Sequence, residues 1–196
     1  MQDPMHIAIQ HHQAGRLQEA GRIYQSVLAR NPNDPEALHL LGLVAHQLGQ
    51  PQPAAQLISR AIGIRPSPLY YANLAEVWRA VGQLDKAVEC CRTALALSPA
   101  HPEAANHLGL ALMQQGKLAE AIEQFRAALM VRPNLAIVHT NLANAFRAQG
   151  ELESAITHYR KAIACDPHLA SAHDNLGQLL CVRQELPEAL EHPLRA

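Results

Sequence analysis

The sequence predicts an all-α fold in which short helix–turn–helix units stack into an α-solenoid. The prediction rests first on alanines that recur every 34 residues, with one step of 33: Ala20, Ala54, Ala87, Ala121, Ala155 and Ala189. A fixed period of this length is the mark of a repeat array, in which each unit buries its apolar face only against its neighbours. Such arrays usually bind other molecules and carry no reaction chemistry of their own.

Two further residue series keep the same register. The first consists of prolines: Pro32, Pro66, Pro99, Pro133 and Pro167. The second consists of small residues: Ala8, Gly42, Ala75, Gly109, Ala143 and Gly177. Together the series divide the chain into repeats at residues 1–34, 35–67, 68–101, 102–135 and 136–169, with an incomplete sixth repeat at 170–196.

Each repeat is predicted to hold two helices, and the fourth shows the pattern most clearly. Its first helix has an apolar face with the helical period: Ala105, Leu108, Gly109 and Leu112. Its second helix has another: Leu118, Ala121, Ile122, Phe125, Ala128 and Leu129. Gly116 lies between them, where a left-handed backbone conformation ends a helix, and Pro133 stops the second helix because proline lacks the N–H donor.

Small residues and caps complete this local pattern. Gly109, Ala121 and Ala128 are small where the two helices of the fourth repeat should cross, which lets their axes approach closely. Helix starts are marked where Asp3, Asp34 or Ser67 precedes a proline, because each can place an oxygen at the N-cap. The step of 33 residues falls in the loop after Pro66.

Composition excludes several classes of function. The net charge is −1, and lysines and arginines are scattered among acidic residues, so no basic stripe is present to bind nucleic acid. No stretch is apolar for long enough to span a membrane, and the first residues, Met1 to Pro4, do not resemble a signal peptide. We therefore expect a cytoplasmic protein. The four cysteines, without a Cys-x-x-Cys pair, are expected to be small buried apolar residues: Cys90, Cys91, Cys165 and Cys181.

The repeat resembles the tetratricopeptide repeat, whose 34-residue pattern is W-x2-L-G-x2-Y, then A-x3-F, then A and P. On the first helices the match is carried by Leu41-Gly42, Leu74-Ala75 with Trp78, Leu108-Gly109 with Leu112, Leu142-Ala143 with Phe146, and Leu176-Gly177 with Leu180. On the second helices it is carried by Ala20 with Tyr24, Ala121 with Phe125, and Ala155 with Tyr159. The match spans essentially the whole chain.

The resemblance implies a right-handed superhelix whose inner groove is lined by the first helix of each repeat and binds a peptide or a partner helix. Family geometry places positions two, five, six, nine, twelve and thirteen of the first helix on this concave face. The candidate binding residues at these positions are Asn73, Glu76, Arg79, His107, Asn141, Asn144, Arg147 and Asn175.

The asparagines suggest how such a groove would bind. An amide has both donor and acceptor groups, so Asn73, Asn141 and Asn175 could pair with the backbone of an extended ligand without reading its side chains. This partial ladder resembles that of O-linked N-acetylglucosamine transferases and their bacterial relatives, and His107 interrupts it. The alternatives are that the asparagines satisfy only local backbone groups or water, and that Arg79 and Arg147 are solvated surface charges.

No active site, cofactor site or metal site is expected. The sequence has no glycine-rich phosphate loop, nucleophile elbow or convergent carboxylate pair. Its 12 histidines lack His-x3-His spacing, and we expect His139 and His173 to pack between adjacent first helices. The predicted protein is therefore not an enzyme by itself.

The sixth repeat departs from the others at its end. Gln184 stands where the earlier repeats have a turn glycine, and Pro193 stands where they have an aromatic residue in the second helix. That last helix is expected to be frayed or kinked and to leave an apolar face uncovered, formed by Leu186, Ala189, Leu190 and Leu194. Another segment of a longer protein could cover this face, or the chain could self-associate through it.

Three functions remain open at this point. The first is an interaction scaffold that holds a protein segment in its groove. The second is the substrate-docking arm of a larger glycosyltransferase of the O-linked N-acetylglucosamine class. The third is a module that assembles with copies of itself through the last repeat.

Overall fold

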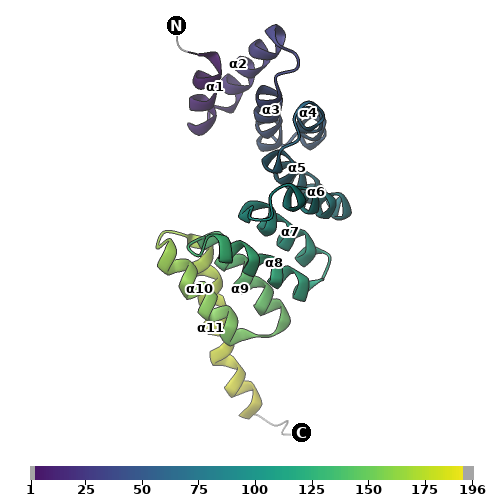
Figure 1. The fold of residues 1–196 in the computed structure, drawn as a ribbon. Coiled ribbons are helices and arrows are strands. Elements are labelled where there is room, and N and C mark those ends of the chain that lie inside the picture. Colours follow the sequence, from purple (N-terminus) through teal and green to yellow (C-terminus); the bar gives the residue numbers. More distant parts are fainter. Residues whose placement is uncertain (1–2, 192–196) are drawn as a thin grey trace. The chain divides into compact units, whose positions relative to one another are not determined.

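The computed structural model describes residues 3–191, with side chains up to Cys181. Over these residues the chain forms eleven α-helices and no strand (Figure 1). The helices are α1 (Pro4–Gln13), α2 (Leu17–Arg30), α3 (Pro35–Gln47), α4 (Pro51–Ile64), α5 (Pro68–Ala80), α6 (Leu84–Leu97), α7 (Pro102–Gln114), α8 (Leu118–Val131), α9 (Ala136–Gln149), α10 (Leu152–Cys165) and α11 (Ala170–Glu191). The predicted all-α fold is confirmed.

The chain divides into two compact parts, residues 1–111 and 112–196. In the first part α1 packs on α2, α3 on α4 and α5 on α6, and these pairs are joined by contacts of α2 with α3 and of α4 with α5. In the second part the contacts run from α8 to α9, from α9 to α10 and from α10 to α11. Helices therefore pack in sequence order within each part, as expected for a solenoid of helix pairs. We refer to the odd-numbered helices as the first helices and to the even-numbered ones as the second helices.

The repeat alanines lie at the centre of this packing. Five of them are fully buried: Ala20, Ala54, Ala87, Ala121 and Ala155. Gly42 lies against the second helix of its own repeat, where a Cβ atom would come within 2.6 Å of Ile58 Cγ1 and 3.2 Å of the Ala54 carbonyl oxygen. In the second repeat the small residues therefore permit a close approach of the two helices, the kind of crossing that the sequence predicts for the fourth repeat.

Each turn between paired helices in the first five repeats contains a glycine with a positive φ angle. The five values lie between 72° and 83°, at Gly15, Gly49, Gly82, Gly116 and Gly150. This left-handed conformation is unfavourable for residues that carry a Cβ atom, and within residues 3–191 only glycines adopt it. The predicted turn at Gly116 is confirmed, and the other four repeat it.

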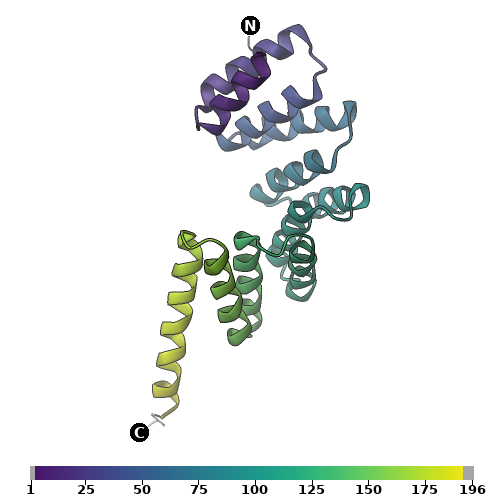
Figure 2. The ribbon, with the colours of Figure 1, turned by 60° about the vertical axis from the view of Figure 1, so that its left-hand side comes forward.

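The sixth repeat does not contain the expected turn. The backbone is helical from Ala170 to Glu191, so α11 passes through Gln184 as one continuous helix (Figure 2). We attribute the difference to residue 184, because glutamine does not readily adopt the left-handed conformation that separates the helices elsewhere. Pro193 and Leu194 lie outside the described residues, and the side chains of Leu186, Ala189 and Leu190 are not described, so the expected apolar face stays a prediction.

The predicted N-caps are confirmed at two of three positions. The Asp3 carboxylate accepts from the Met5 backbone N–H, and the Asp34 carboxylate accepts from those of Glu36 and Ala37. The Ser67 hydroxyl makes no cap hydrogen bond, although Pro68 begins α5 as expected.

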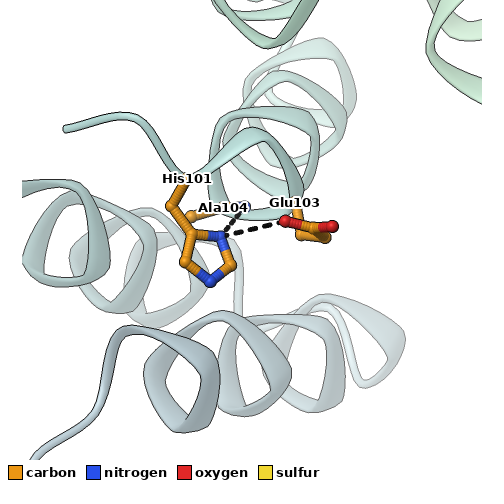
Figure 3. A network of polar contacts seen from close by, with 3 residues as sticks. All are labelled: His101, Glu103 and Ala104. Atoms are coloured by element: carbon orange, nitrogen blue, oxygen red, sulfur yellow. Dashed lines mark hydrogen bonds and ion pairs between the residues drawn. The ribbon is translucent and has the colours of Figure 1, made fainter. Parts of the chain in front are cut away.

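A histidine fills the corresponding place before α7. The Ala104 backbone N–H donates to His101 Nδ1 at 3.2 Å, and Glu103 Oε2 lies 3.3 Å from the same nitrogen (Figure 3). Nδ1 accepts from Ala104 only when it carries no proton, and it donates to Glu103 only when protonated. The two contacts are therefore alternatives, and the neutral ring is the one that caps the helix.

The expectation for the cysteines is correct only in part. Cys91 is buried and Cys90 is partly buried, but Cys165 and Cys181 are exposed. Burial raises the pKa of the Cys91 thiol to about 12 and that of Cys90 to about 11. Cys165 is the last residue of α10, where the solenoid pattern no longer requires a buried side chain.

The small residues of the first helices provide a matched test of this packing. Gly42→Ala should destabilise the protein by about 1–3 kcal/mol, because the new methyl group overlaps Ile58 and the Ala54 carbonyl. Gly177→Ala should be neutral or should stabilise the protein by up to about 1 kcal/mol, because no atom lies within 4 Å and alanine favours a helix. Urea unfolding followed by circular dichroism measures both. Equal effects of the two substitutions would contradict the role assigned to Gly42.

Candidate functional site

Polar side chains of the predicted concave positions form bonds between consecutive first helices. The first of these bonds along the chain joins α1 to α3, where His12 Nε2 donates to the Gln47 side-chain oxygen at 3.0 Å. A second joins α3 to α5 through His39 and Asn73, and a third joins α9 to α11 through Asn144 and Asn175. These bonds hold neighbouring repeats together and fix the orientation of several candidate binding residues.

The bond between Asn73 and His39 is short and partly buried. Asn73 Nδ2 lies 2.8 Å from His39 Nε2, and an amide nitrogen can only donate, so Nε2 is the acceptor and the ring proton is on Nδ1. The His39 ring stacks on Tyr70 with centroids 4.3 Å apart, and the Tyr70 hydroxyl accepts from Arg65 Nη2 at 2.8 Å. Asn73 is therefore held in place by α3, a partner 34 residues earlier that the repeat period could have suggested.

His39 is kept neutral by its surroundings. It is 3% exposed, and burial, together with the nearby His12, lowers its pKa to about 4. A neutral ring is also what the Asn73 bond requires, because a protonated Nε2 would not accept. The protonation state of His39 is thus tied to the contact between α3 and α5.

Three further candidate residues gather between α5 and α7. Glu76 and Arg79 lie one helical turn apart on α5, and both of their charges act on His107 of α7. Burial, the largest effect, lowers the pKa of His107, with the Glu76 carboxylate opposing it and the Arg79 and His101 charges adding to it. His107 Nδ1 and Arg79 Nε are both buried and have no hydrogen-bond partner among the described residues.

In the second compact part Asn144 is the centre of a polar cluster. Its Oδ1 accepts from the Tyr159 hydroxyl at 2.6 Å and from Asn175 Nδ2 at 3.3 Å. Burial raises the pKa of Tyr159, and the charge of Arg147 opposes this shift, which places Arg147 near the cluster. The structure thus brings together three predicted site residues, and Tyr159 is a fourth member that the sequence analysis assigned only to the core.

Asn141 and Arg147 differ in exposure. Asn141 is partly buried and has an interaction within the fold, whereas Arg147 is exposed. The amides of Asn73 and Asn175 bond to neighbouring first helices. Arg147 is exposed, as the surface-charge alternative expects, whereas Arg79 is partly buried.

The two histidines singled out by sequence contact different groups from those expected. His139 is buried, but its Nε2 donates to the Pro133 carbonyl oxygen at 2.9 Å and its Nδ1 lies 3.2 Å from His158 Nδ1 on α10. His173 is exposed, and its Nε2 donates to the Pro167 carbonyl oxygen at 3.0 Å. Each ring thus anchors the loop before its own helix, and the expected packing between adjacent first helices is wrong for His173. Among the described side chains no group of three or more His, Cys, Asp or Glu residues is arranged to hold a metal ion.

One hollow lies away from the predicted site and was missed by the sequence analysis. It has a volume of about 400 Å³ and is lined by Ala119, Glu120, Ile122, Glu123, Arg126, Phe146, Gln149 and Glu151. Arg126 donates from Nη1 to Glu123 Oε1 at 2.8 Å and lies over the Phe146 ring. The residues that line the hollow come from α8, the end of α9 and the following turn, which become adjacent only when the chain folds.

The neutral state of His39 predicts a dependence of stability on pH. The unfolded chain takes up a proton near pH 6.5, but the folded chain does so only near pH 4, so stability is full above pH 6.5 and falls as pH decreases toward 4. His39 should account for a loss on the order of 3 kcal/mol over this range. His39→Gln keeps a hydrogen-bonding group but does not titrate, and it should flatten the dependence. Urea unfolding at several pH values measures it, and an unchanged slope would contradict the burial argument.

Comparisons with known proteins agree with this architecture. A family model described as the cilia and flagella-associated protein 70 C-terminal domain matches residues 5–196. Tetratricopeptide repeat protein 7A from Homo sapiens is 37% identical over 90 residues, which cover 45% of this chain and 10% of that protein. The chain thus matches about a tenth of the length of this relative.

No helix among residues 3–191 is long and apolar enough to cross a membrane.

Solved structures share the same fold. TTC0263, a thermophilic tetratricopeptide-repeat protein of Thermus thermophilus, superposes with a TM-score of 0.80 at 23% identity, covering 91% of this chain and 97% of that one. YrrB, described as a tetratricopeptide-repeat protein with an unusual peptide-binding site, gives a TM-score of 0.65 at 21% identity, covering 88% and 89%. The chain is therefore a tetratricopeptide-repeat protein and belongs to the family of the cilia and flagella-associated protein 70 C-terminal domain.

Proposed function

We propose that this chain is a protein-interaction scaffold that binds an extended segment of a partner protein along its first helices. The observation that carries the proposal is the set of polar and charged side chains on α5, α7, α9 and α11, of which Asn73, Asn144 and Asn175 are held by hydrogen bonds. The full set is Asn73, Glu76, Arg79, His107, Asn141, Asn144, Arg147 and Asn175. Hydrogen bonding to a peptide backbone suits such a surface, because amides offer both donors and acceptors.

The bonds between first helices support this role rather than excluding it. A primary amide has two N–H donors and one acceptor oxygen, so the single bond from Asn73 to His39 leaves further groups for a ligand. The same holds for Asn175, whose Nδ2 donates to Asn144. Because these bonds fix the side chains before a ligand arrives, less conformational entropy is lost on binding.

The chemistry of the chain favours a protein over other partners. With a net charge of −1, it has no excess of positive charge with which to neutralise phosphates, so nucleic acid is a poor partner. YrrB, which shares the fold, is described as having a peptide-binding site. We propose the same class of ligand here, without an enzymatic activity, a cofactor or a membrane partner, and with a cytoplasmic location.

An alternative proposal is that the chain is the docking arm of a larger glycosyltransferase of the O-linked N-acetylglucosamine class. The asparagines at position six of the first helices, Asn73, Asn141 and Asn175, favour it. This alternative requires a transferase domain in the same polypeptide, so sequencing the complete reading frame tests it. A complete frame without such a domain would contradict it.

Self-assembly through the last repeat is a second alternative, favoured by the apolar residues that the sequence places there. Light scattering over a range of concentrations measures the molar mass directly. A constant monomer mass would contradict this alternative and leave the scaffold proposal intact.

The scaffold proposal predicts that the asparagines contribute to binding more than to stability. Peptides enriched on the chain from a random library of about 12 residues should bind Asn141→Ala/Asn175→Ala at least about tenfold more weakly, because each lost hydrogen bond contributes about 1 kcal/mol. Fluorescence anisotropy measures the affinity, and thermal melting shows whether the fold is kept. The matched control is Asn33→Ala/Asn134→Ala, which changes two exposed loop residues. Equal affinities for the two double variants would contradict the assignment of the site.

A further inference from the structure

Two buried polar atoms of the candidate binding residues have no hydrogen-bond partner in the part of the chain that the structure describes. They are Arg79 Nε on α5 and His107 Nδ1 on α7. Buried polar groups in folded proteins are almost always hydrogen-bonded, so each such exception calls for an explanation. Both residues occupy positions of the first helix that the repeat geometry assigns to ligand contact.

The two atoms belong to helices that share one core cluster. Helices α5 and α7 pack into the same core cluster, in which Ala72 of α5 and Ala104 of α7 are both fully buried. The charge of Arg79 reaches His107, as does the charge of Glu76. All of these residues lie in the first compact part of the chain, so the site does not depend on the second part.

The unused groups define the chemistry of a ligand. Arg79 Nε–H can only donate, and a neutral His107 can donate from Nδ1 when its other ring nitrogen is unprotonated. A group that accepts from both must be an acceptor, and a guanidinium favours a carboxylate because charge-assisted bonds are the stronger ones. We propose that Arg79 and His107 bind the side-chain carboxylate of an acidic residue in the extended partner segment, an inference that rests on the scaffold function proposed above.

A single carboxylate fits this site. Helices α5 and α7 contain no lysine or arginine other than Arg79. Arg79 thus supplies one guanidinium, which matches one carboxylate. Glu76, one turn before Arg79, repels an anion and should therefore limit the affinity of the site.

The test uses the whole chain and the same library of random peptides, joined to their carrier through the C-terminus. In this library every carboxylate within the random segment is a side chain. Peptides enriched on the wild-type chain should share an aspartate or glutamate at one position, and Arg79→Gln should abolish this preference. Circular dichroism of the variant shows whether it is folded.

The contact is then measured by comparing the affinity of one enriched peptide with that of its counterpart, in which the amide replaces the acidic residue. Arg79→Gln should lower the affinity for the acidic peptide about tenfold or more and leave the affinity for the amide peptide unchanged. Glu76→Gln should raise the affinity for the acidic peptide several-fold, because it removes a negative charge that repels the carboxylate of the peptide. Arg92→Gln is the control, since it removes an exposed arginine of α6 that is not among the candidate binding residues, and it should leave the acidic preference intact.

The outcomes separate this inference from the scaffold proposal. Enrichment of peptides without an acidic preference would overturn the inference and leave the scaffold function standing. An acidic preference that survives in Arg79→Gln would also overturn the inference, because the carboxylate would then bind elsewhere. No enrichment over a blank surface would overturn both.

Discussion

The close approach of the two helices in each repeat is the constraint on which the rest of the structure depends. It requires a small residue on each helix, and the repeat alanines of the second helices are fully buried: Ala20, Ala54, Ala87, Ala121 and Ala155. Short helices are marginally stable alone in water, so this packing supplies most of their stability. These contacts also position the polar side chains on the other face of the first helices.

The sixth repeat shows what happens when part of this arrangement is missing. Gln184 replaces the turn glycine, and α11 continues as one helix to Glu191. Without a second helix folded back along it, Gly177 is open: outside its own helix backbone, no atom of the described residues lies within 4 Å of a Cβ placed there. Gly42 in the second repeat is tightly enclosed by contrast. The turn glycine therefore decides whether a second helix folds back and packs against the small residue of the first helix.

The repeat period was sufficient to predict the helices, the glycine turns and the buried alanines, because each depends on backbone geometry or on residues of the same repeat. Polar partners were harder to predict. The bond from Asn73 to His39 joins residues 34 positions apart, and the choice of partner depends on how α3 and α5 lie against each other. Ser67 was predicted to cap α5 and does not, whereas the His101 ring, for which no cap was predicted, caps α7. Side-chain rotamers decide such cases, and a periodic pattern contains no information about them.

The polar positions of the first helices are of two kinds. At Asn73 and Asn175 the fold itself supplies a partner, so these side chains stabilise the stacking of repeats whether or not a ligand is present. At Arg79 Nε and His107 Nδ1 the described fold supplies none, and leaving a buried donor unsatisfied costs about 1–3 kcal/mol. Stacking alone gives no reason for that cost, because an apolar residue at either position would avoid it. The unsatisfied atoms therefore point to a role in binding a ligand, and the hydrogen-bonded Asn73 amide, on the same helix as Arg79, is held rigidly for the same role.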